Sequence, residues 1–206
     1  MHRYFLLNKP YNMLSQFKGN EKSGRLIGEL TFDFPEGTHA VGRLDYTSEG
    51  LLLLTTNKQV TRLLFEGKEP HSRTYHVMVK NHVSNEKLQQ LRNGVRIRIS
   101  GEEYYTTPPC EAHIVPAPTG LPQREGEVEW DVPHTWLSIT IFEGKFRQVR
   151  KMVAAIGHPC RRLIRVAIED MELDGLPSGC IKEMNEETFF RLLKLPLPAS
   201  PAGSGK

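Results

Sequence analysis

The chain has 206 residues, of which 38% are hydrophobic and 25% are charged, and its formal net charge is +3. A globular chain of this length buries roughly 70% of its unfolded surface, so neither disulfides nor a structural metal is needed for folding. The composition excludes a disordered chain, and the longest apolar run, Leu51 to Leu54, is far short of the ~20 residues of a transmembrane helix.

Short apolar or alternating runs separated by turn residues predict β-strands along the chain. They lie at residues 4–7, 39–41, 51–55, 75–79, 95–99, 112–115, 135–142 and 163–168. The segment 42–50 lies between two of these strands and is polar, so we expect a loop there. Residues 102–132 contain five prolines, which predicts loops around the short strand at 112–115.

Apolar residues at helical spacing, bounded by capping residues, predict four helices. They cover residues 58–65 after Asn57, the segment between Ser84 and Gly94, residues 146–156 before Gly157, and residues 186–194 after Asn185. In the third helix, Phe146, Val149, Val153 and Ile156 share an apolar face. Because strands and helices do not alternate regularly, we expect an α+β fold with a central mixed or antiparallel sheet.

The positive charge is concentrated in one segment. All charged residues between Gly144 and Ile168 are basic, whereas acidic residues outnumber basic ones elsewhere; the basic ones are Lys145, Arg147, Arg150, Lys151, Arg161, Arg162 and Arg165. Side chains of like charge in one segment repel one another, and the phosphate backbone of a nucleic acid would relieve this repulsion. The alternative is a solvated helix face without a ligand.

Asp45 is the candidate catalytic group. It lies in the polar loop between two apolar strands, where a rigid frame can hold a carboxylate in place. The same residue would alternatively cap the turn, with its carboxylate accepting backbone N–H groups. Residue chemistry alone leaves both interpretations open.

Other catalytic classes lack their residue patterns. The histidines show no H-E-x-x-H spacing for zinc, and G-x-S-x-G, G-x-G-x-x-G and phosphate-loop sequences are absent. The three cysteines, Cys110, Cys160 and Cys180, are far apart, which is typical of the reducing cytoplasm. We therefore expect a cytoplasmic protein without a metal site and without a membrane partner.

Four sequence blocks in a fixed order resemble one enzyme family. They are Asn8-Lys9-Pro10-Tyr11, residues 42–55 beginning Gly42-Arg43-Leu44-Asp45, Arg73-Thr74-Tyr75-His76-Val77, and residues 143–152 containing Arg147-Gln148-Val149-Arg150. Together they are similar to the RsuA family of pseudouridine synthases, which isomerise uridines in ribosomal RNA. The resemblance implies the pseudouridine synthase fold, with residues 1–195 as the catalytic domain, divisible into two subdomains, and residues 196–206 as a disordered tail.

The resemblance also implies roles for three residues. Asp45 would be the catalytic aspartate, Tyr75 the aromatic residue that packs against the target base, and Arg150 the basic partner of Asp45. The reaction breaks the N1–C1′ bond and forms a C5–C1′ bond, and it requires no metal or cofactor. Whether the aspartate acts as nucleophile or base stays open.

The target uridine must leave its helical stack to reach such a site, and Arg43 is a candidate to fill the space it leaves. Phosphate contacts would come from Lys145, Arg147, Lys151, Arg161, Arg162 and Arg165. The core begins at Tyr4 without the S4 RNA-binding domain of many members, which makes the chain most similar to short members and implies 23S rRNA as partner. We expect a monomer. The alternative is a non-catalytic rRNA-binding or ribosome-assembly factor that keeps the fold.

Overall fold

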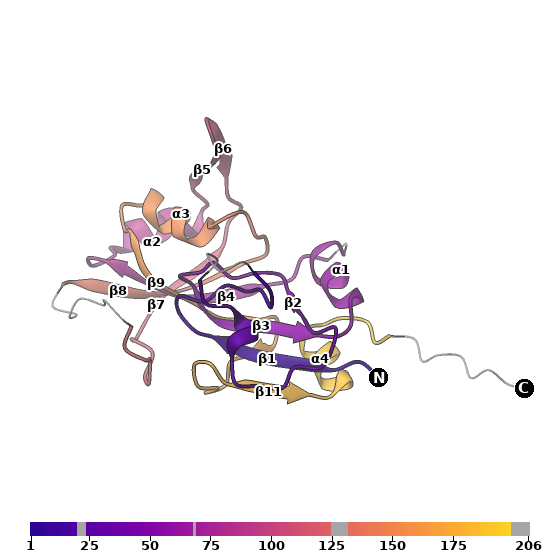
Figure 1. Cartoon of the computed structure of the whole chain (residues 1–206). Coiled ribbons are helices and arrows are strands. Elements are labelled where there is room, and N and C mark those ends of the chain that lie inside the picture. The colour runs from indigo at the N-terminus through magenta and orange to yellow at the C-terminus, as the bar shows by residue number, and fades with distance from the viewer. Residues whose placement is uncertain (20–23, 68, 125–131, 199–206) are drawn as a thin grey trace, which may run out of the picture.

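The computed structural model describes residues 1–19, 24–67, 69–124 and 132–198 (Figure 1). Nine strands of this part form one sheet, whose main path runs β11-β1-β3-β9-β4-β8-β7, with β2 paired to β3 and β10 to β9. They are β1 (Tyr4–Lys9), β2 (His39–Val41), β3 (Glu49–Thr55), β4 (Arg73–Lys80), β7 (Glu111–Val115), β8 (His134–Ile141), β9 (Cys160–Ile168), β10 (Met171–Glu172) and β11 (Ile181–Met184). The predicted mixed sheet is confirmed, since β3 and β9 run parallel and the other neighbours antiparallel.

Helices cover both faces of this sheet (Figure 1). They are α1 (Gln59–Phe65), α2 (Asn85–Arg92), α3 (Gln148–Ala155) and α4 (Glu186–Leu192), in addition to a short 3-10 helix at Ile27–Glu29. In β3, Leu52 and Leu54 belong to the hydrophobic cluster under α2 and α3, whereas Leu51 and Leu53 belong to the cluster under α1 and α4. A strand buried on both faces explains the uninterrupted run of leucines.

Two strands project from the body of the molecule as a hairpin (Figure 1). These are β5 (Arg96–Ser100) and β6 (Glu103–Thr106), which pair with each other and not with the main sheet. The sequence predicted β5, but it placed β6 in a loop, and it also missed β10 and β11. The residues of β6 and β11 are half-buried or exposed, and β10 has only two residues, so these strands lack the apolar alternation that marks a strand.

Three predicted helix caps show the expected chemistry. Ser84 Oγ accepts a hydrogen bond from the Lys87 amide at 3.2 Å, and Asn185 Oδ1 accepts one from the Thr188 amide at 2.8 Å. Asn57 Oδ1 likewise accepts from the amide of the first residue of α1 at 3.0 Å.

The predicted start of α3 is wrong. Because Arg147 has a left-handed backbone with φ 53°, the helix begins after it, and Phe146 is 70% exposed instead of packing on the apolar face.

Near the C-terminus, the described chain packs against the core as far as Leu195. Leu195 still packs in the hydrophobic cluster under α4, whereas most of the predicted disordered tail, residues 196–206, lies outside the described residues. No helix in the described ranges has the length and apolar character needed to cross a membrane.

Candidate active site

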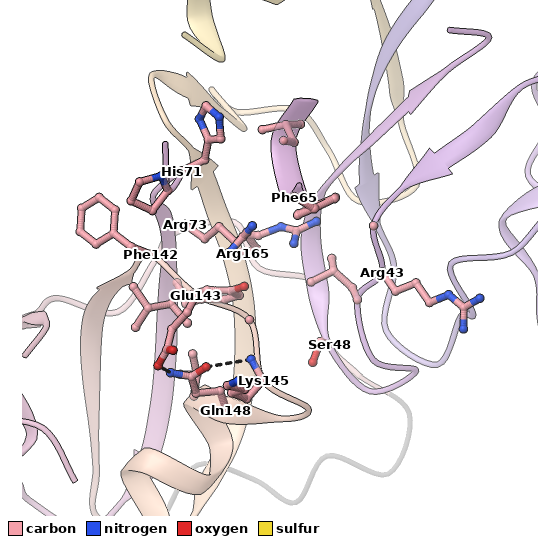
Figure 2. Close-up of a pocket in the computed structure, with 18 of the residues that line it drawn as sticks. Arg43, Ser48, Phe65, His71, Arg73, Phe142, Glu143, Lys145, Gln148 and Arg165 are labelled. Atoms are coloured by element: carbon pink, nitrogen blue, oxygen red, sulfur yellow. Dashed lines mark hydrogen bonds between the residues drawn. The ribbon is translucent and has the colours of Figure 1, made fainter. Parts of the chain in front are cut away.

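A cavity of about 650 Å³ opens between the loop after β2, the start of β4 and the segment that leads from β8 into α3 (Figure 2). Its lining includes both Asp45 and Tyr75. Four of the predicted RNA-binding residues also line it, namely Arg43, Lys145, Arg147 and Arg165. Segments far apart in the sequence therefore meet at one hollow. Within the described residues, no cluster of three histidine, cysteine or carboxylate side chains is arranged to hold a metal ion.

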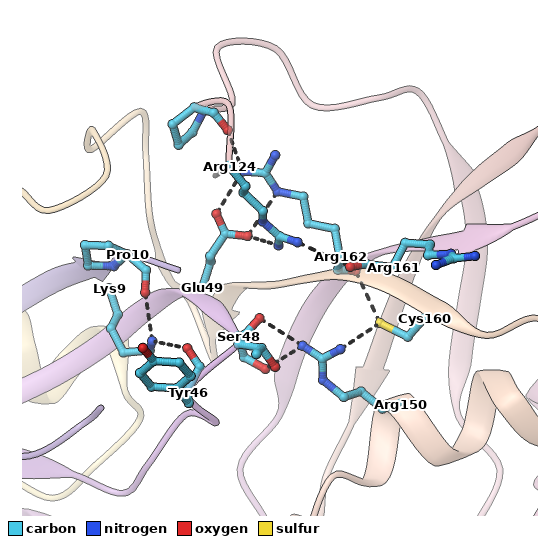
Figure 3. A network of polar contacts seen from close by, with 12 residues as sticks. Lys9, Pro10, Tyr46, Ser48, Glu49, Arg124, Arg150, Cys160, Arg161 and Arg162 are labelled. Atoms are coloured by element: carbon cyan, nitrogen blue, oxygen red, sulfur yellow. Dashed lines mark hydrogen bonds and ion pairs between the residues drawn. The ribbon is translucent and has the colours of Figure 1, made fainter. Parts of the chain in front are cut away.

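Arg150 ties α3 to the loop that carries Asp45 (Figure 3). Its Nη2 donates hydrogen bonds to the Thr47 carbonyl at 3.0 Å and to Ser48 Oγ at 3.1 Å, and its Nε lies 3.8 Å from Asp45 Oδ2. The Asp45 side chain is 30% exposed and accepts no backbone hydrogen bond from the described residues. The carboxylate is therefore oriented by an arginine and open to the cavity, which does not fit the turn-capping alternative.

Two buried side chains hold the same loop from the other side. Ser15 Oγ donates to the Leu44 carbonyl and accepts from the Leu44 amide, both at 3.0 Å. Lys9 is fully buried, and its Nζ donates to the Met13 carbonyl at 2.6 Å and approaches the Tyr46 carbonyl at 3.5 Å (Figure 3). Burial lowers the pKa of Lys9 to about 7. The loop backbone on either side of Asp45 is thus fixed by side chains.

Glu49, the first residue of β3, anchors the far end of the loop. It is 4% exposed, and its Oε1 and Oε2 accept hydrogen bonds from Arg162 Nη2 at 2.8 Å and Nε at 3.0 Å. Arg124 pairs with the same carboxylate (Figure 3). Arg162 is only 1% exposed, so the structure corrects its predicted place on an RNA-binding surface. Its positive charge pairs with Glu49 in the interior of the protein.

The remaining basic residues are divided among different environments. Arg43, Lys145, Arg147 and Arg161 are exposed, and Lys151 is half-buried with its Nζ 3.3 Å from the Ile99 carbonyl. Arg165 is 3% exposed, lies in the cavity wall, and donates from Nε to the Leu51 carbonyl at 2.8 Å. Two of the arginines predicted to contact phosphates, Arg162 and Arg165, are therefore buried and do not share an exposed surface with the others.

Tyr75 combines a core position with a place in the cavity wall. It is 9% exposed, and it pairs in register with Ile139 on β8 and Arg165 on β9. The alternating strand pattern predicts the inward direction, whereas the cavity itself is formed by distant segments. Sequence reasoning missed the roles of Ser15 and Glu49. For Lys9, its place as a charged residue at the end of an apolar strand could have indicated a buried role.

Comparison with known proteins defines the class of this one. The profile of a family described as RNA pseudouridylate synthase matches residues 3–155. A crystal structure of a pseudouridylate synthase superposes with a TM-score of 0.72 at 26% identity, covering 93% of this chain and 74% of that one. The chain belongs to the RNA pseudouridine synthase family, and the enzyme is an isomerase.

Its curated relatives narrow the comparison further. Ribosomal large subunit pseudouridine synthase E of Xanthomonas axonopodis pv. citri is 41% identical over 174 residues, which are 83% of this chain and 88% of that protein. The protein of the same name from Vibrio parahaemolyticus is 35% identical over 184 residues, or 88% of this chain and 74% of the relative. The resemblance to the RsuA family and the predicted fold are both confirmed.

Proposed function

We propose that this enzyme converts a specific uridine of large-subunit 23S rRNA into pseudouridine, with Asp45 as the catalytic residue. The observation that carries the proposal is the Asp45 carboxylate, which is open to the cavity and oriented by Arg150 at 3.8 Å, with Tyr75 in the wall of the same cavity. The names of the relatives from Xanthomonas and Vibrio support the choice of large-subunit RNA.

The chemistry follows from these three side chains. The ionised carboxylate of Asp45 acts at the ribose, as nucleophile on C1′ or as base, while the N1–C1′ bond breaks. The freed uracil turns, C5 bonds to C1′, the proton on C5 is lost, and N1 gains a proton. The guanidinium of Arg150 lies beside Asp45 and orients its carboxylate. The ring of Tyr75 holds the freed base by stacking without fixing its rotation.

The exposed cations near the cavity supply contacts to the RNA backbone. The target uridine is flipped out of its stack to enter the cavity. Arg43, exposed at the rim, fills the space that it leaves. Lys145 and Arg147 at the rim, with Lys151 and Arg161 farther along the chain, neutralise phosphates.

The test is the variant Asp45→Asn, which keeps the shape of the side chain and removes its charge. Pseudouridine formation in a 23S rRNA transcript should fall by a factor on the order of 10³ or more. The unfolding temperature and the RNA affinity serve as controls for folding and binding. Wild-type turnover in Asp45→Asn contradicts the proposal. A wild-type protein that binds rRNA but forms no pseudouridine is instead a non-catalytic rRNA-binding or assembly factor.

A further inference from the structure

Two buried arginines lie in the wall of the cavity, and no catalytic role has been given to either so far. Arg73 on β4 is 7% exposed, and Arg165 on the neighbouring strand β9 is 3% exposed. Figure 2 shows both side chains entering the pocket from these two strands. Arg73 stands two residues before Tyr75, on the same side of β4, and Tyr75 pairs in register with Arg165. Both cations therefore surround the position assigned to the target base.

Neither guanidinium is neutralised by the part of the protein that the structure describes. Nη2 of Arg165 is buried and has no hydrogen-bond partner there. The guanidinium of Arg73 lies over the ring of Phe65, with 5.0 Å between its carbon and the ring centre. No carboxylate of the described ranges forms an ion pair with Arg73 or Arg165. Nη2 of Arg165 and the guanidinium nitrogens of Arg73 thus have no hydrogen-bond acceptor among the described residues.

Three carboxylates in or near the cavity are engaged with partners other than the two arginines. Glu143, which also lines the cavity, accepts from the Tyr105 hydroxyl at 2.6 Å and from Gln148 Nε2 at 2.5 Å. Glu169 pairs with Lys194 at 2.9 Å and also accepts from the amide before Arg73. Asp45 pairs with Arg150. Glu69, the other carboxylate in the lining, is exposed, and no carboxylate among the described residues forms an ion pair with either buried arginine.

Such an arrangement is costly for the folded protein. A buried cation without a counter-ion loses its hydration and gains no compensating attraction. Burial is the main cause that lowers the pKa of Arg73; Tyr75 and Glu169 oppose this shift, whereas the charge of Arg165 adds to it. A ligand that brings negative charge into the cavity removes this penalty.

We propose that Arg73 and Arg165 form an oxyanion-binding site for the target nucleotide. This inference rests on the proposed function and deepens it. The planar forks of two guanidiniums suit oxygen anions with more than one acceptor. The anion comes either from a phosphodiester beside the target uridine or from the uracil ring. When the N1–C1′ bond breaks, its electron pair stays on the ring, and the negative charge spreads to the ring oxygens.

The first test measures anion binding without turnover, with inorganic phosphate as the probe. Phosphate at about 100 times its dissociation constant should raise the unfolding temperature of the wild type by about 5 °C, relative to chloride at equal ionic strength. Asp45→Asn should keep the shift, and Arg73→Met should lose it while retaining the apolar contact with Phe65. Lys80→Met removes an exposed charge at the other end of β4 and should keep the shift. Equal shifts in Arg73→Met and wild type overturn the site.

The second test distinguishes the two sources of the anion by steady-state kinetics on an RNA substrate. A phosphodiester ligand predicts that Arg73→Met raises KM about tenfold or more with little change in kcat. A uracil ligand predicts that kcat falls by a similar factor at unchanged RNA affinity. Arg73→Lys, which keeps the charge, should retain more activity than Arg73→Met. Unchanged kcat and KM in Arg73→Met overturn the inference.

Failure of the inference and failure of the proposed function give different results. Turnover in Asp45→Asn together with a phosphate shift that depends on Arg73 rejects the catalytic role of Asp45 and leaves the anion site standing. Loss of turnover in Asp45→Asn with a phosphate shift independent of Arg73 rejects the anion site and leaves the catalytic role of Asp45 standing. Arg73 is the better position for these tests, because substitution of Arg165 also breaks its hydrogen bond to the Leu51 carbonyl.

Discussion

The position of Asp45 depends on its backbone more than on its own side chain. The carboxylate is partly open to solvent, yet the residues around it in the loop are held by Lys9, Ser15 and Arg150. A carboxylate that must reach the ribose of a large RNA needs access, so burial cannot be used to fix it. Fixing the neighbouring carbonyls gives the same rigidity without closing the site.

At Tyr75, the proposed stacking role predicts different effects for two substitutions. Tyr75→Phe keeps the ring and should retain at least about a tenth of wild-type kcat/KM, whereas Tyr75→Ala should lose about 100-fold or more. The assay should run at a temperature where circular dichroism shows Tyr75→Ala to be folded, because the truncation also leaves a core cavity. Equal losses in the two variants contradict stacking as the main role of Tyr75.

Lys9 predicts a pH dependence of stability. Its pKa is about 7 in the folded protein and about 10.4 in an unfolded chain. Between these values the unfolded chain binds a proton that the folded protein has lost, so the contribution of Lys9 to the free energy of unfolding rises with pH. Below about pH 7 both states hold the proton, and the contribution is constant.

The measurement compares wild type with Lys9→Met by urea unfolding between about pH 7.5 and about pH 9.5. The difference in free energy of unfolding should move in favour of wild type, with a slope approaching ~1.4 kcal/mol per pH unit. Lys9→Met also loses the hydrogen bonds from Lys9 to backbone carbonyls. Because this loss is the same at every pH, it changes the size of the difference between the two proteins but not its slope. Parallel pH profiles would show that Lys9 keeps its proton in the folded protein.

Between elements, the parallel contact of β3 with β9 depends on a glycine. Gly50 has φ +101°, and a Cβ at this position would lie 2.2 Å from the carbonyl oxygen of Arg165. Gly50→Ala should therefore force the two strands apart and lower the free energy of unfolding by about 3 kcal/mol or more. Urea denaturation gives this value directly.

Gly37→Ala is the matched control, since Gly37 also has a positive φ of +80° but has no atom within 4 Å of the added Cβ. It should lose only about 1 kcal/mol, the cost of the left-handed backbone alone. If Gly37→Ala and Gly50→Ala are equally destabilised, the close approach of β3 and β9 contributes nothing to the loss of stability in Gly50→Ala.

Among the helices and strands, the sequence predicts those that are marked by a local pattern of apolar and capping residues. Apolar strands and capped helices were predicted correctly, whereas the short strands β6, β10 and β11 were missed because partners supplied by the fold stabilise them. The site loop was also predicted. The inward direction of Arg162 was not, because its partner Glu49 lies 113 residues away. Arg161 and Arg162 are neighbours in one basic run, yet they point to opposite sides of β9, one to solvent and one to Glu49.

For the molecule as a whole, the exposed charges predict a salt dependence of RNA binding. Arg147→Met removes one phosphate contact and should reduce the slope of log K against log salt by about 1. Lys182→Met, at the exposed edge strand β11, should leave the slope unchanged. Fluorescence anisotropy across a salt series measures both. An unchanged slope in Arg147→Met would remove this residue from the proposed RNA surface.

The central place of β9 has a consequence for synthesis of the protein. This strand lies between β3 and β4 in the sheet, although about 80 residues or more separate it from each of them in the chain. While the ribosome still holds residues 160–168, β4 and the start of β3 at Glu49 and Gly50 lack their strand partner, and Glu49 has no Arg162. Such edges invite wrong pairing and aggregation. The sheet of this RNA pseudouridine synthase can thus close only after the segment that forms β9 has left the ribosome.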